Sequence, residues 1–534
     1  MVAAAAVAAG CNPATPQHAA GAERRQVATL TAAATMMRKD YTDYLNSEPG
    51  AADVLDYRLG QLWRRGVDGA GTTVAVIEGW DDPRIGQQMA LFDGTLGLPK
   101  AQIRTIYPTG DGRLPAACPP GMQALGSYGS CAGWAGELLL DVMSVHLVAP
   151  YAKILIAVAP ADSQITDDAA SQVAPPEMMQ AVEQIARRHL ADVISISDGT
   201  GEGSYSHGAE EITAQDPGEL AAAAAGIPLL VATGDCGAVQ ALPERDAPCT
   251  KVTRGRQTAT WADSPWVTAV GGSTPDLGPR GKRRGPDRLW DIQGSYGSAA
   301  GFSSVFARPG YQNGVAATTG SRMRSVPDLV MDATHGTSEA APLLAGVLAL
   351  ATQLNHGRDI GPINPVLYGV LGPAGARDGI ADVVSGNDSV TTRHGRVLVR
   401  GFAAAPGFDV ASGWGTINAG RFVPALVAAT VAAHQDAAVR GSAAAALSAL
   451  EHHVRLVPGT VSPAGTSRLT AGGFLPGHPV QLAVDGRRLR TLTASPAGVV
   501  TARVKPARLS LLAGPHTITL TSMLITKTVT LTVR

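Results

Sequence analysis

Ser338 is the residue whose setting most suggests nucleophilic chemistry. It lies in a Gly-Thr-Ser turn that leads into an Ala-rich apolar segment over residues 335–350, and Pro342 falls in the expected first turn of that helix. Proline is tolerated in a first turn because its missing N–H has no helical partner there. The turn would present Ser338 where backbone N–H groups are free. Serine is a weak nucleophile without a base, so the chain must also supply one.

Glu137 and Asp141 are the acidic pair that could provide this base. They are four residues apart in GWAGELLLDVMSVHLVAP, a spacing that places both carboxyl groups on one face of a helix. Two such acids repel and shift each other's pKa values, and an acid pair in an apolar helix is costly unless it is used. Taken alone, an exposed polar stripe on a surface helix is the more common explanation.

Asp235 is a third candidate, held in the Gly-rich stretch VATGDCGA after an apolar run. A helix N-cap is its ordinary alternative.

The cysteines pair locally, Cys118 with Cys131 and Cys236 with Cys249, which favours two short disulfide loops and an oxidising compartment. Four buried thiols in a cytosolic protein are the alternative.

Short apolar runs alternate with helical patterns through the middle of the chain and would position these side chains. The runs typical of buried strands are 72–78, 153–159, 192–197, 228–234 and 264–272, and the helical patterns are 134–148, 176–190 and 218–227. This alternation predicts an α/β fold, a doubly wound and mainly parallel sheet. Ligands of such sheets bind beyond the carboxyl ends of the strands, and Asp235 lies at one of these ends.

The flanking regions differ in composition, and five segments are expected. They are a leader at 1–11, a mobile N-terminal or short pro-segment at 12–53, the α/β domain at 54–422, an Ala-rich helical segment at 423–454 and a small all-β sandwich at 455–534. The leader is similar to the end of a secretion signal, and AAGC resembles a bacterial lipoprotein cleavage site that would place a lipid on Cys11. A disordered Ala-rich leader is the alternative. The segment 423–454 could be a linker or a helix packed on the main domain.

The overall charge is balanced, with a net charge of −1 and 16% charged residues in 534, and no basic stripe stands out. This composition disfavours a nucleic-acid partner. No uninterrupted apolar run is long enough to span a bilayer.

The order of the three motifs resembles a known family. GTSEAAPLLAGVLAL is similar to the nucleophile segment of subtilisin-like proteases, but no His-Gly-Thr-His motif is present and VIEGW (76–80) replaces the subtilisin acid motif. Glu-x-x-x-Asp, Gly-Asp-x-Gly and Gly-Thr-Ser in this order resemble the sedolisins, the serine-carboxyl peptidases. The stretches SPWVTAVGGS, GFSSVFARPGYQ, VPDLVMDA and INPVLY agree, and the resemblance covers about 57–422. We expect an Ig-like fold for the sandwich that follows.

The resemblance implies a role for each residue. Glu137 would be the general base for Ser338, Asp141 would orient Glu137, and a protonated Asp235 would donate a hydrogen bond to the oxyanion. Ser197, Asp198 and Gly199 would lie alongside an extended peptide; an aromatic residue is usual at the position of Asp198. His335 lies just before the nucleophile turn, with no explanation beyond local packing.

The resemblance also implies a calcium ion near the end of the peptidase domain. Two segments, ADVVSGND and APGFDVASGWG, would bind it through the carboxylates of Asp382 and Asp409 and the carbonyls of Val383, Ala405 and Gly407. Ordinary turn acids are the alternative for both aspartates.

The sequence therefore predicts a monomeric, secreted or cell-surface bacterial endopeptidase that cleaves peptide or protein substrates through an acyl-enzyme at acidic pH. The alternative is a binding or surface protein that keeps the sedolisin scaffold without turnover.

Overall fold

The structure is a computed structural model. It describes residues 57–108, 131–159, 176–205, 208–241, 249, 252–276, 284–292, 296–392, 395–433, 435–451, 454–474, 479–495, 498–522 and 525–534. Cys11, the leader, the segment 12–53 and Cys118 lie outside the described residues. The lipid on Cys11, the pro-segment and the pair Cys118–Cys131 therefore stay predictions.

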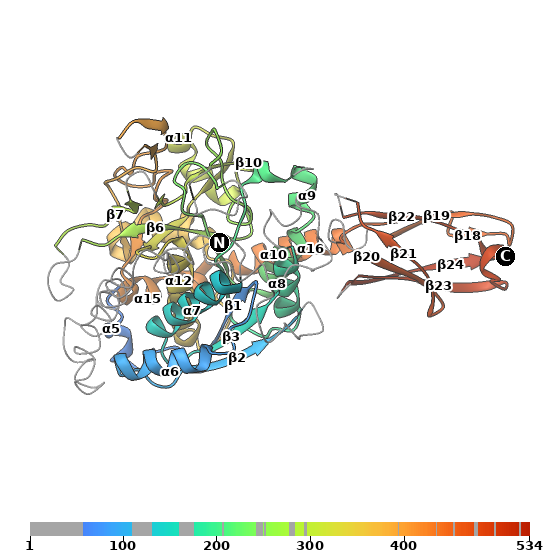
Figure 1. The fold of residues 1–534 in the computed structure, drawn as a ribbon, viewed down its shortest axis with the longest axis horizontal. Coiled ribbons are helices and arrows are strands. Elements are labelled where there is room, and N and C mark those ends of the chain that lie inside the picture. The colour runs from blue at the N-terminus through green and yellow to red at the C-terminus, as the bar shows by residue number, and fades with distance from the viewer. Residues whose placement is uncertain are drawn as a thin grey trace, which may run out of the picture.

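A parallel sheet with strand order β12-β6-β5-β4-β1-β3-β2 forms the centre of the molecule (Figure 1). Its strands are β1 (Thr73–Glu78), β2 (Gln102–Ile106), β3 (Lys153–Val158), β4 (Val193–Ile196), β5 (Leu229–Ala232), β6 (Thr268–Thr274) and β12 (Leu329–Asp332). The five predicted strands are confirmed, and so is the fold class. The edge strands β2 and β12 were not predicted; β2 is polar and partly exposed, so it lacks the apolar run that is typical of a buried strand.

The strands are apolar throughout because both faces of the sheet are covered. On β1, Val74 and Val76 point into one core cluster, whereas Ala75 and Ile77 point into the other. The first cluster packs against α6 (Ile85–Leu96), α7 (Cys131–Val148), α12 (Thr337–Leu354) and α15 (Ala419–Ala433). The second packs against α8 (Glu177–Arg187), α10 (Asp216–Ala225) and α16 (Gln435–Glu451).

The Ala-rich segment 423–454 forms part of this main body. It supplies most of α15 and all of α16. Phe422, Val423 and Leu426 of α15 are fully buried in the first cluster, and Ala443 and Leu447 of α16 are buried in the second. Of the two possibilities left open by the sequence, the structure shows helices packed on the main domain (Figure 1).

The smaller elements complete the main body. They are α5 (Gly60–Trp63), η3 (Glu202–Ser204), α9 (Ala209–Thr213), β7 (Arg288–Leu289), β8 (Asp291–Ile292), β9 (Tyr296–Gly297), β10 (Gly301–Ala307), η5 (Gly310–Val315), α11 (Ala316–Thr319), β11 (Met323–Val326), α13 (Asn364–Val366), η6 (Leu367–Leu371), α14 (Gly372–Ala374), η7 (Gly375–Asp378), β13 (Ile380–Ala381), β14 (Val390–Thr391), β15 (Val397–Val399) and β16 (Thr416–Ile417).

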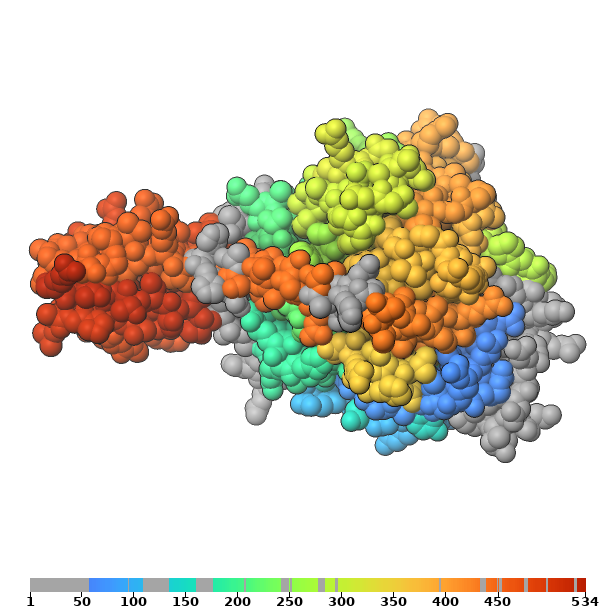
Figure 2. Space-filling view, turned by 180° about the vertical axis from the view of Figure 1, so that it is seen from behind, coloured from blue at the N-terminus to red at the C-terminus, as the bar shows by residue number. Residues whose placement is uncertain are grey.

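The C-terminal residues form two antiparallel sheets around a separate apolar core, here called the β-domain (residues 454–534). Its elements are β17 (Val454–Val457), β18 (Thr460–Val461), β19 (Ser467–Ala471), β20 (Pro479–Val484), β21 (Arg487–Thr493), β22 (Val500–Val504), α17 (Pro506–Leu509), β23 (Gly514–Ser522) and β24 (Ile525–Val533). Among the described strand pairs of these sheets, β18 and β24 are parallel and the others are antiparallel. The β-domain projects from the main body as a distinct lobe (Figure 2). Among the described helices, none is long and apolar enough to cross a membrane.

Candidate active site

The candidate residues converge at one edge of the parallel sheet. Ser197 follows the last residue of β4, Asp235 lies three residues after the end of β5, and Ser338 is the second residue of α12. Glu137 and Asp141 lie on α7, which packs against α12. The carboxyl ends of parallel strands meet at the same edge, which brings residues remote in sequence together.

Asp141 is connected to the backbone of Ser338 through one hydroxyl group. The Oγ of Ser197 lies 3.0 and 3.1 Å from the two carboxyl oxygens of Asp141 and 3.1 Å from the carbonyl oxygen of Ser338. Asp141 and Glu137 are 0% and 1% exposed, so neither belongs to an exposed polar stripe. The structure therefore excludes the ordinary explanation of this acid pair.

Pro342 explains why the Ser338 carbonyl is available to Ser197. We expected Pro342 in the first turn of the helix, but α12 begins at Thr337, so Pro342 is its sixth residue. In a regular helix the N–H of residue 342 would bond to the carbonyl of residue 338, and proline has no N–H to give. The orphaned carbonyl of Ser338 accepts from Ser197 instead. Because of Pro342, the nucleophile turn is thus hydrogen-bonded to Ser197, directly after β4.

Asp235 is held against the same turn by two hydrogen bonds from Thr337, the residue before Ser338. Asp235 Oδ1 accepts hydrogen bonds from the backbone N–H of Thr337 at 2.8 Å and from Thr337 Oγ1 at 2.7 Å. Burial raises the pKa of Asp235 to about 7, although both bonds from Thr337 act to lower it. Because Oδ1 already accepts two bonds, Oδ2 is the oxygen left to carry a proton and donate it.

Burial also raises the pKa values of the carboxyl groups around Glu137. The pKa of Asp141 is well above its ordinary value because of burial and then because of the nearby Glu137 carboxylate. The pKa of Glu78 is likewise well above its ordinary value, from burial and then from Asp141 and Glu137. Three carboxyl groups in one water-poor site cannot all ionise at once, so they titrate as a coupled set.

Glu78 is the member of this set that the sequence did not single out. It is the last residue of β1, fully buried, and neither of its carboxyl oxygens has a hydrogen-bond partner among the described residues. The sequence signal for Glu78 is in VIEGW, where a lone acid ends an otherwise apolar run. A buried unpartnered carboxyl group at the end of a strand is costly and points to function.

The segment expected to contact substrate continues from Ser197. Asp198 is buried, its Oδ1 accepts from the N–H of Gly199 at 2.7 Å, and burial raises its pKa. Asp198 also contributes to raising the pKa of Glu78, so it lies near the carboxyl set.

His335 has a structural role before the nucleophile turn. Glu339 Oε2 accepts from the backbone N–H of His335 at 2.9 Å and lies 3.2 Å from its Nδ1. This contact holds His335, the residue before the N-cap Gly336, against the first turn of α12. It raises the pKa of His335, chiefly through the side-chain bond to Glu339.

The predicted disulfide between Cys236 and Cys249 is present, with Cα atoms 5.3 Å apart. It holds the loop that carries Asp235. On its other side the loop is bonded to the segment before β14, where the N–H of Ala238 donates to the carbonyl of Asp388 at 2.8 Å.

The two segments predicted to bind calcium lie side by side. Asp382 Oδ2 accepts from the N–H of Gly407 at 2.7 Å, and Asp409 Oδ2 accepts from the N–H of Ala405 at 2.9 Å. Ser412 Oγ lies 3.4 Å from the carbonyl of Val383 and 2.9 Å from Asp409 Oδ2. All five predicted ligands thus come from one small region.

The fit to a cation differs between the two carboxylates. Asp382 Oδ1 is buried and has no hydrogen-bond partner among the described residues, as an oxygen reserved for a cation would be. The Asp409 carboxylate already accepts four bonds, from Ala405 N, Ala411 N, Ser412 N and Ser412 Oγ. The region therefore fits a hard cation through Asp382 and nearby carbonyls, and Asp409 would have to exchange a bond to join them.

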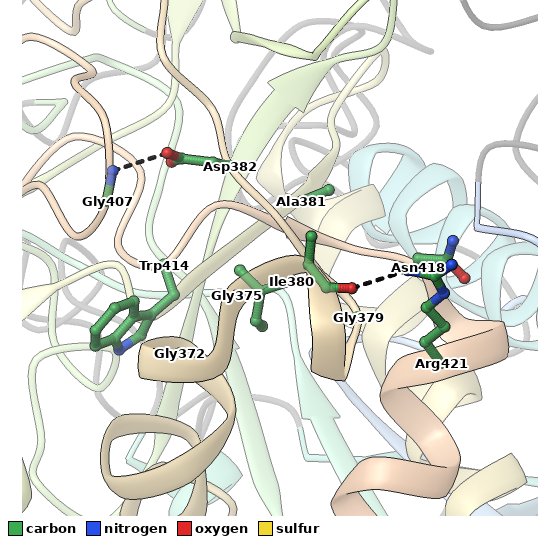
Figure 3. Close-up of a pocket in the computed structure, with 11 residues that line it drawn as sticks. Gly372, Gly375, Gly379, Ile380, Ala381, Asp382, Gly407, Trp414, Asn418 and Arg421 are labelled. Carbon is green, nitrogen blue, oxygen red and sulfur yellow. Dashed lines mark hydrogen bonds between the residues drawn. The ribbon is translucent and has the colours of Figure 1, made fainter.

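A pocket of about 390 Å³ lies beside Asp382 and Gly407 (Figure 3). Trp414, Asn418 and Arg421 also line it, and glycines form much of its wall. None of the candidate catalytic residues lines this pocket, so the catalytic assignment depends on the polar contacts and not on cavity size.

Comparison with known proteins shows which families and folds this chain resembles. Residues 129–364 match the model of the subtilase family, Peptidase S8. Kumamolisin from Bacillus sp. (strain MN-32) is 27% identical over 413 residues, which are 72% of this chain and 65% of kumamolisin. Mouse tripeptidyl-peptidase 1 is 31% identical over 233 residues, which are 37% of each chain. The chain thus spans about two thirds of kumamolisin and just over a third of tripeptidyl-peptidase 1.

Among solved structures, Pseudomonas sedolisin, a serine-carboxyl proteinase complexed with pseudo-iodotyrostatin, aligns with a TM-score of 0.54 at 23% identity. The alignment covers 67% of this chain and 92% of that structure. The fold is therefore subtilisin-like. Within that class, the chain is similar to kumamolisin and, in fold, to the serine-carboxyl proteinase sedolisin.

Proposed function

We propose that the protein is an exported serine-carboxyl endopeptidase that works at acidic pH. The observation that carries this proposal is the contact of both acidic elements with one turn: Asp141 reaches Ser338 through Ser197, and Asp235 bonds to Thr337. A turn bonded in this way on both sides is preorganised for nucleophilic attack.

In this proposal Ser338 attacks the substrate carbonyl and Glu137 accepts its proton, then returns it to the leaving amine. Asp141, fixed by Ser197, orients Glu137. The developing oxyanion receives hydrogen bonds from protonated Asp235 and from the backbone N–H of Ser338, which has no partner within its helix. Water then hydrolyses the acyl-enzyme by the same proton transfers in reverse order.

The acidic optimum follows from opposite requirements. Glu137 must be ionised to act as a base, whereas Asp235 must be protonated to act as a donor. A pKa of about 7 for Asp235 keeps that donor protonated through the acidic range. We therefore infer a bell-shaped profile on the acid side of neutrality.

The substrate would be an extended peptide paired with the backbone of Ser197, Asp198 and Gly199. Calcium would stabilise the distal region through Asp382, with Val383, Ala405, Gly407 and Asp409 as further ligands. It would supply structural charge there and take no part in the chemistry. We also propose that the protein is exported and attached to the membrane by a lipid on Cys11.

A fluorophosphonate probe tests the assignment directly. It should label Ser338 in the parent protein and nothing in Ser338→Ala, and that variant should retain its fold and lose peptidase activity on a denatured protein substrate. The variant Ser321→Ala, at a half-buried loop position, is the matched control and should be labelled like the parent. Labelling of another serine would sink the assignment.

A further inference from the structure

The β-domain has a charge composition unlike that of the rest of the chain. Between Val454 and Arg534 the sequence has ten basic residues and one acidic residue, whereas the whole chain has 43 basic and 44 acidic residues. The remainder therefore carries 33 basic and 43 acidic residues. The balanced net charge of the whole chain conceals this asymmetry.

Two arginines lie directly opposite each other on an exposed sheet face. Arg468 on β19 pairs across strands with Arg503 on β22. Both are exposed, while their strand neighbours Leu469 and Ala502 point into the core. Like charges in such a position are destabilising in the absence of an anion.

The same positive surface extends to neighbouring strands. Arg455 of β17 is exposed and lies opposite Thr470 of β19. β21 is an edge strand of the second sheet and lies against β22. The exposed arginines of these strands, here called the basic face, are Arg455, Arg468 and Arg503 on one sheet face together with Arg487, Arg488 and Arg490 on the adjacent edge strand β21.

Nothing in the described part of the chain neutralises the basic face. No ion pair involves any of its six arginines there. The one acid of the β-domain, Asp485, is bonded to His516 Nδ1 at 2.6 Å and to the N–H of Thr517 at 2.8 Å.

A second copy of the chain is also a poor partner for this face. Much of the acidity of the main body is buried, including Glu202, Asp263 and Asp328 in addition to the candidate catalytic carboxyl groups. Buried carboxyl groups present no complementary surface. Within the described residues, the acids of the main body therefore offer the basic face little exposed complementary charge, which favours a different molecule as its partner.

We propose that the basic face binds a polyanionic polysaccharide, one whose sugars carry sulfate or carboxylate groups. The arginine side chain presents a rigid fork that bonds bidentately to such anions, and it remains charged at acidic pH. Cross-strand neighbours are about 5 Å apart, so successive arginines can meet successive charges along a linear polymer.

The composition of the β-domain argues against nucleic acids and anionic membranes as the partner of the basic face. Its one aromatic residue, Phe474, is fully buried, so no ring is available to stack on nucleic-acid bases. The arginines lie on strands, and no helix presents them to a DNA groove. The large exposed apolar side chains described there are Val457 and Leu512, too few to insert in a membrane.

Binding of the full-length protein to a size-defined heparin oligosaccharide tests this proposal. Calorimetry at pH 5 and two salt concentrations would measure the affinity of the parent and of Arg468→Gln/Arg503→Gln. The double variant should bind roughly tenfold more weakly, as expected for the loss of two exposed charge contacts. The affinity should also depend less steeply on salt.

The double variant Arg104→Gln/Arg322→Gln is the matched control, since both arginines are exposed on the main body without a described ion pair. It should bind heparin like the parent. Arg468→Lys/Arg503→Lys keeps the charge and loses the fork, so its affinity should lie between parent and Gln variant. Peptidase activity plays no part in this readout.

Three results would overturn the proposal. They are no binding of heparin by the parent, an equal loss in the control variant, and tighter binding of duplex DNA or phosphatidylglycerol vesicles than of heparin at equal charge concentration. The last would assign the basic face to a different class of polyanion.

Discussion

At the residue scale, the environment of Asp235 decides how the proposed mechanism depends on pH. Its Oδ1 is fixed by two donors from Thr337, and burial places its pKa at about 7. A carboxyl group in this setting is a hydrogen-bond donor in acid and an unfavourable buried charge above neutrality. The upper limit of activity should therefore follow Asp235.

The variant Asp235→Asn tests this at the same geometry. An asparagine Oδ1 can still accept from Thr337 while its NH₂ group donates at every pH, so the alkaline limb of kcat/KM should move upward and the peak should fall modestly. The profile should be measured between roughly pH 3 and 8, bracketing the reference carboxyl values and the raised one. Asp276→Asn, a half-exposed position paired with Arg284, should leave the profile unchanged. An unshifted alkaline limb in Asp235→Asn would contradict the donor role.

At the scale of elements, the hydroxyl group of Ser197 connects the end of β4 to α12. Its hydrogen bond to the Ser338 carbonyl depends on Pro342. Ser197 satisfies the carbonyl that Pro342 leaves without a helical donor, and it fixes Asp141 at the same time. The strand thus fixes the relative position of the nucleophile turn and the acid helix α7. Loss of this one hydroxyl should affect both stability and activity.

Ser195 on β4 and Ser197 just after this strand allow the effect of these contacts to be separated from the simple loss of a hydroxyl group. Ser197→Ala removes the one hydroxyl that contacts both the Asp141 carboxyl group and the Ser338 carbonyl, and it should cost about 1–3 kcal/mol of stability together with a marked loss of kcat. Ser195 is equally buried, and its hydroxyl has no hydrogen-bond partner among the described residues. Ser195→Ala should therefore be neutral or stabilising. Denaturant unfolding and kinetics on both variants would show it, and equal effects would refute the connecting role of Ser197.

At the scale of the whole molecule, buried carboxyl groups tie stability to acid. Burial raises the pKa values of Asp216 and Asp388 to about 7, as it does for Asp235. A folded state that retains protons which the unfolded chain releases loses stability as pH rises between the two pKa values.

The free energy of unfolding should therefore be fully retained below about pH 4 and fall between about pH 4 and 7, by about 1.4 kcal/mol per pH unit for each such group. Urea unfolding at several pH values would measure this slope. The variant Asp216→Asn should flatten it, because its side chain has no proton to lose. A stability that rises toward neutrality would contradict the prediction.

Calcium belongs to the same scale, because its proposed ligands come from two segments that close the main body. A cation that binds only the folded state should add about 2.7 kcal/mol at a hundredfold excess over its dissociation constant. Chelation should lower the melting temperature, and calcium but not zinc should restore it. Asp382→Asn should remove most of this response, whereas an unchanged melting curve in chelator would count against the site.

Local patterns in the sequence were sufficient to predict several features of the fold and the site. Apolar runs of strand length, the helical spacing of Glu137 and Asp141, and the order of three short motifs were enough to predict a parallel α/β sheet and the sedolisin family. One short disulfide, between cysteines 13 residues apart, also followed from proximity along the chain. Local pattern carries this information because strand and helix periodicity depend on neighbouring residues.

Which polar side chains lie close together depends on tertiary packing. Glu78 ends a strand that sequence reasoning treated as core, and its proximity to Asp141 depends on the packing of α7 over β1. The carbonyl of Ser338 and the hydroxyl of Ser197 are 141 residues apart in the chain. The cross-strand pair Arg468–Arg503 depends on the register of β19 with β22. Such contacts are set by how elements pack and pair over long separations, and no local pattern encodes that distance.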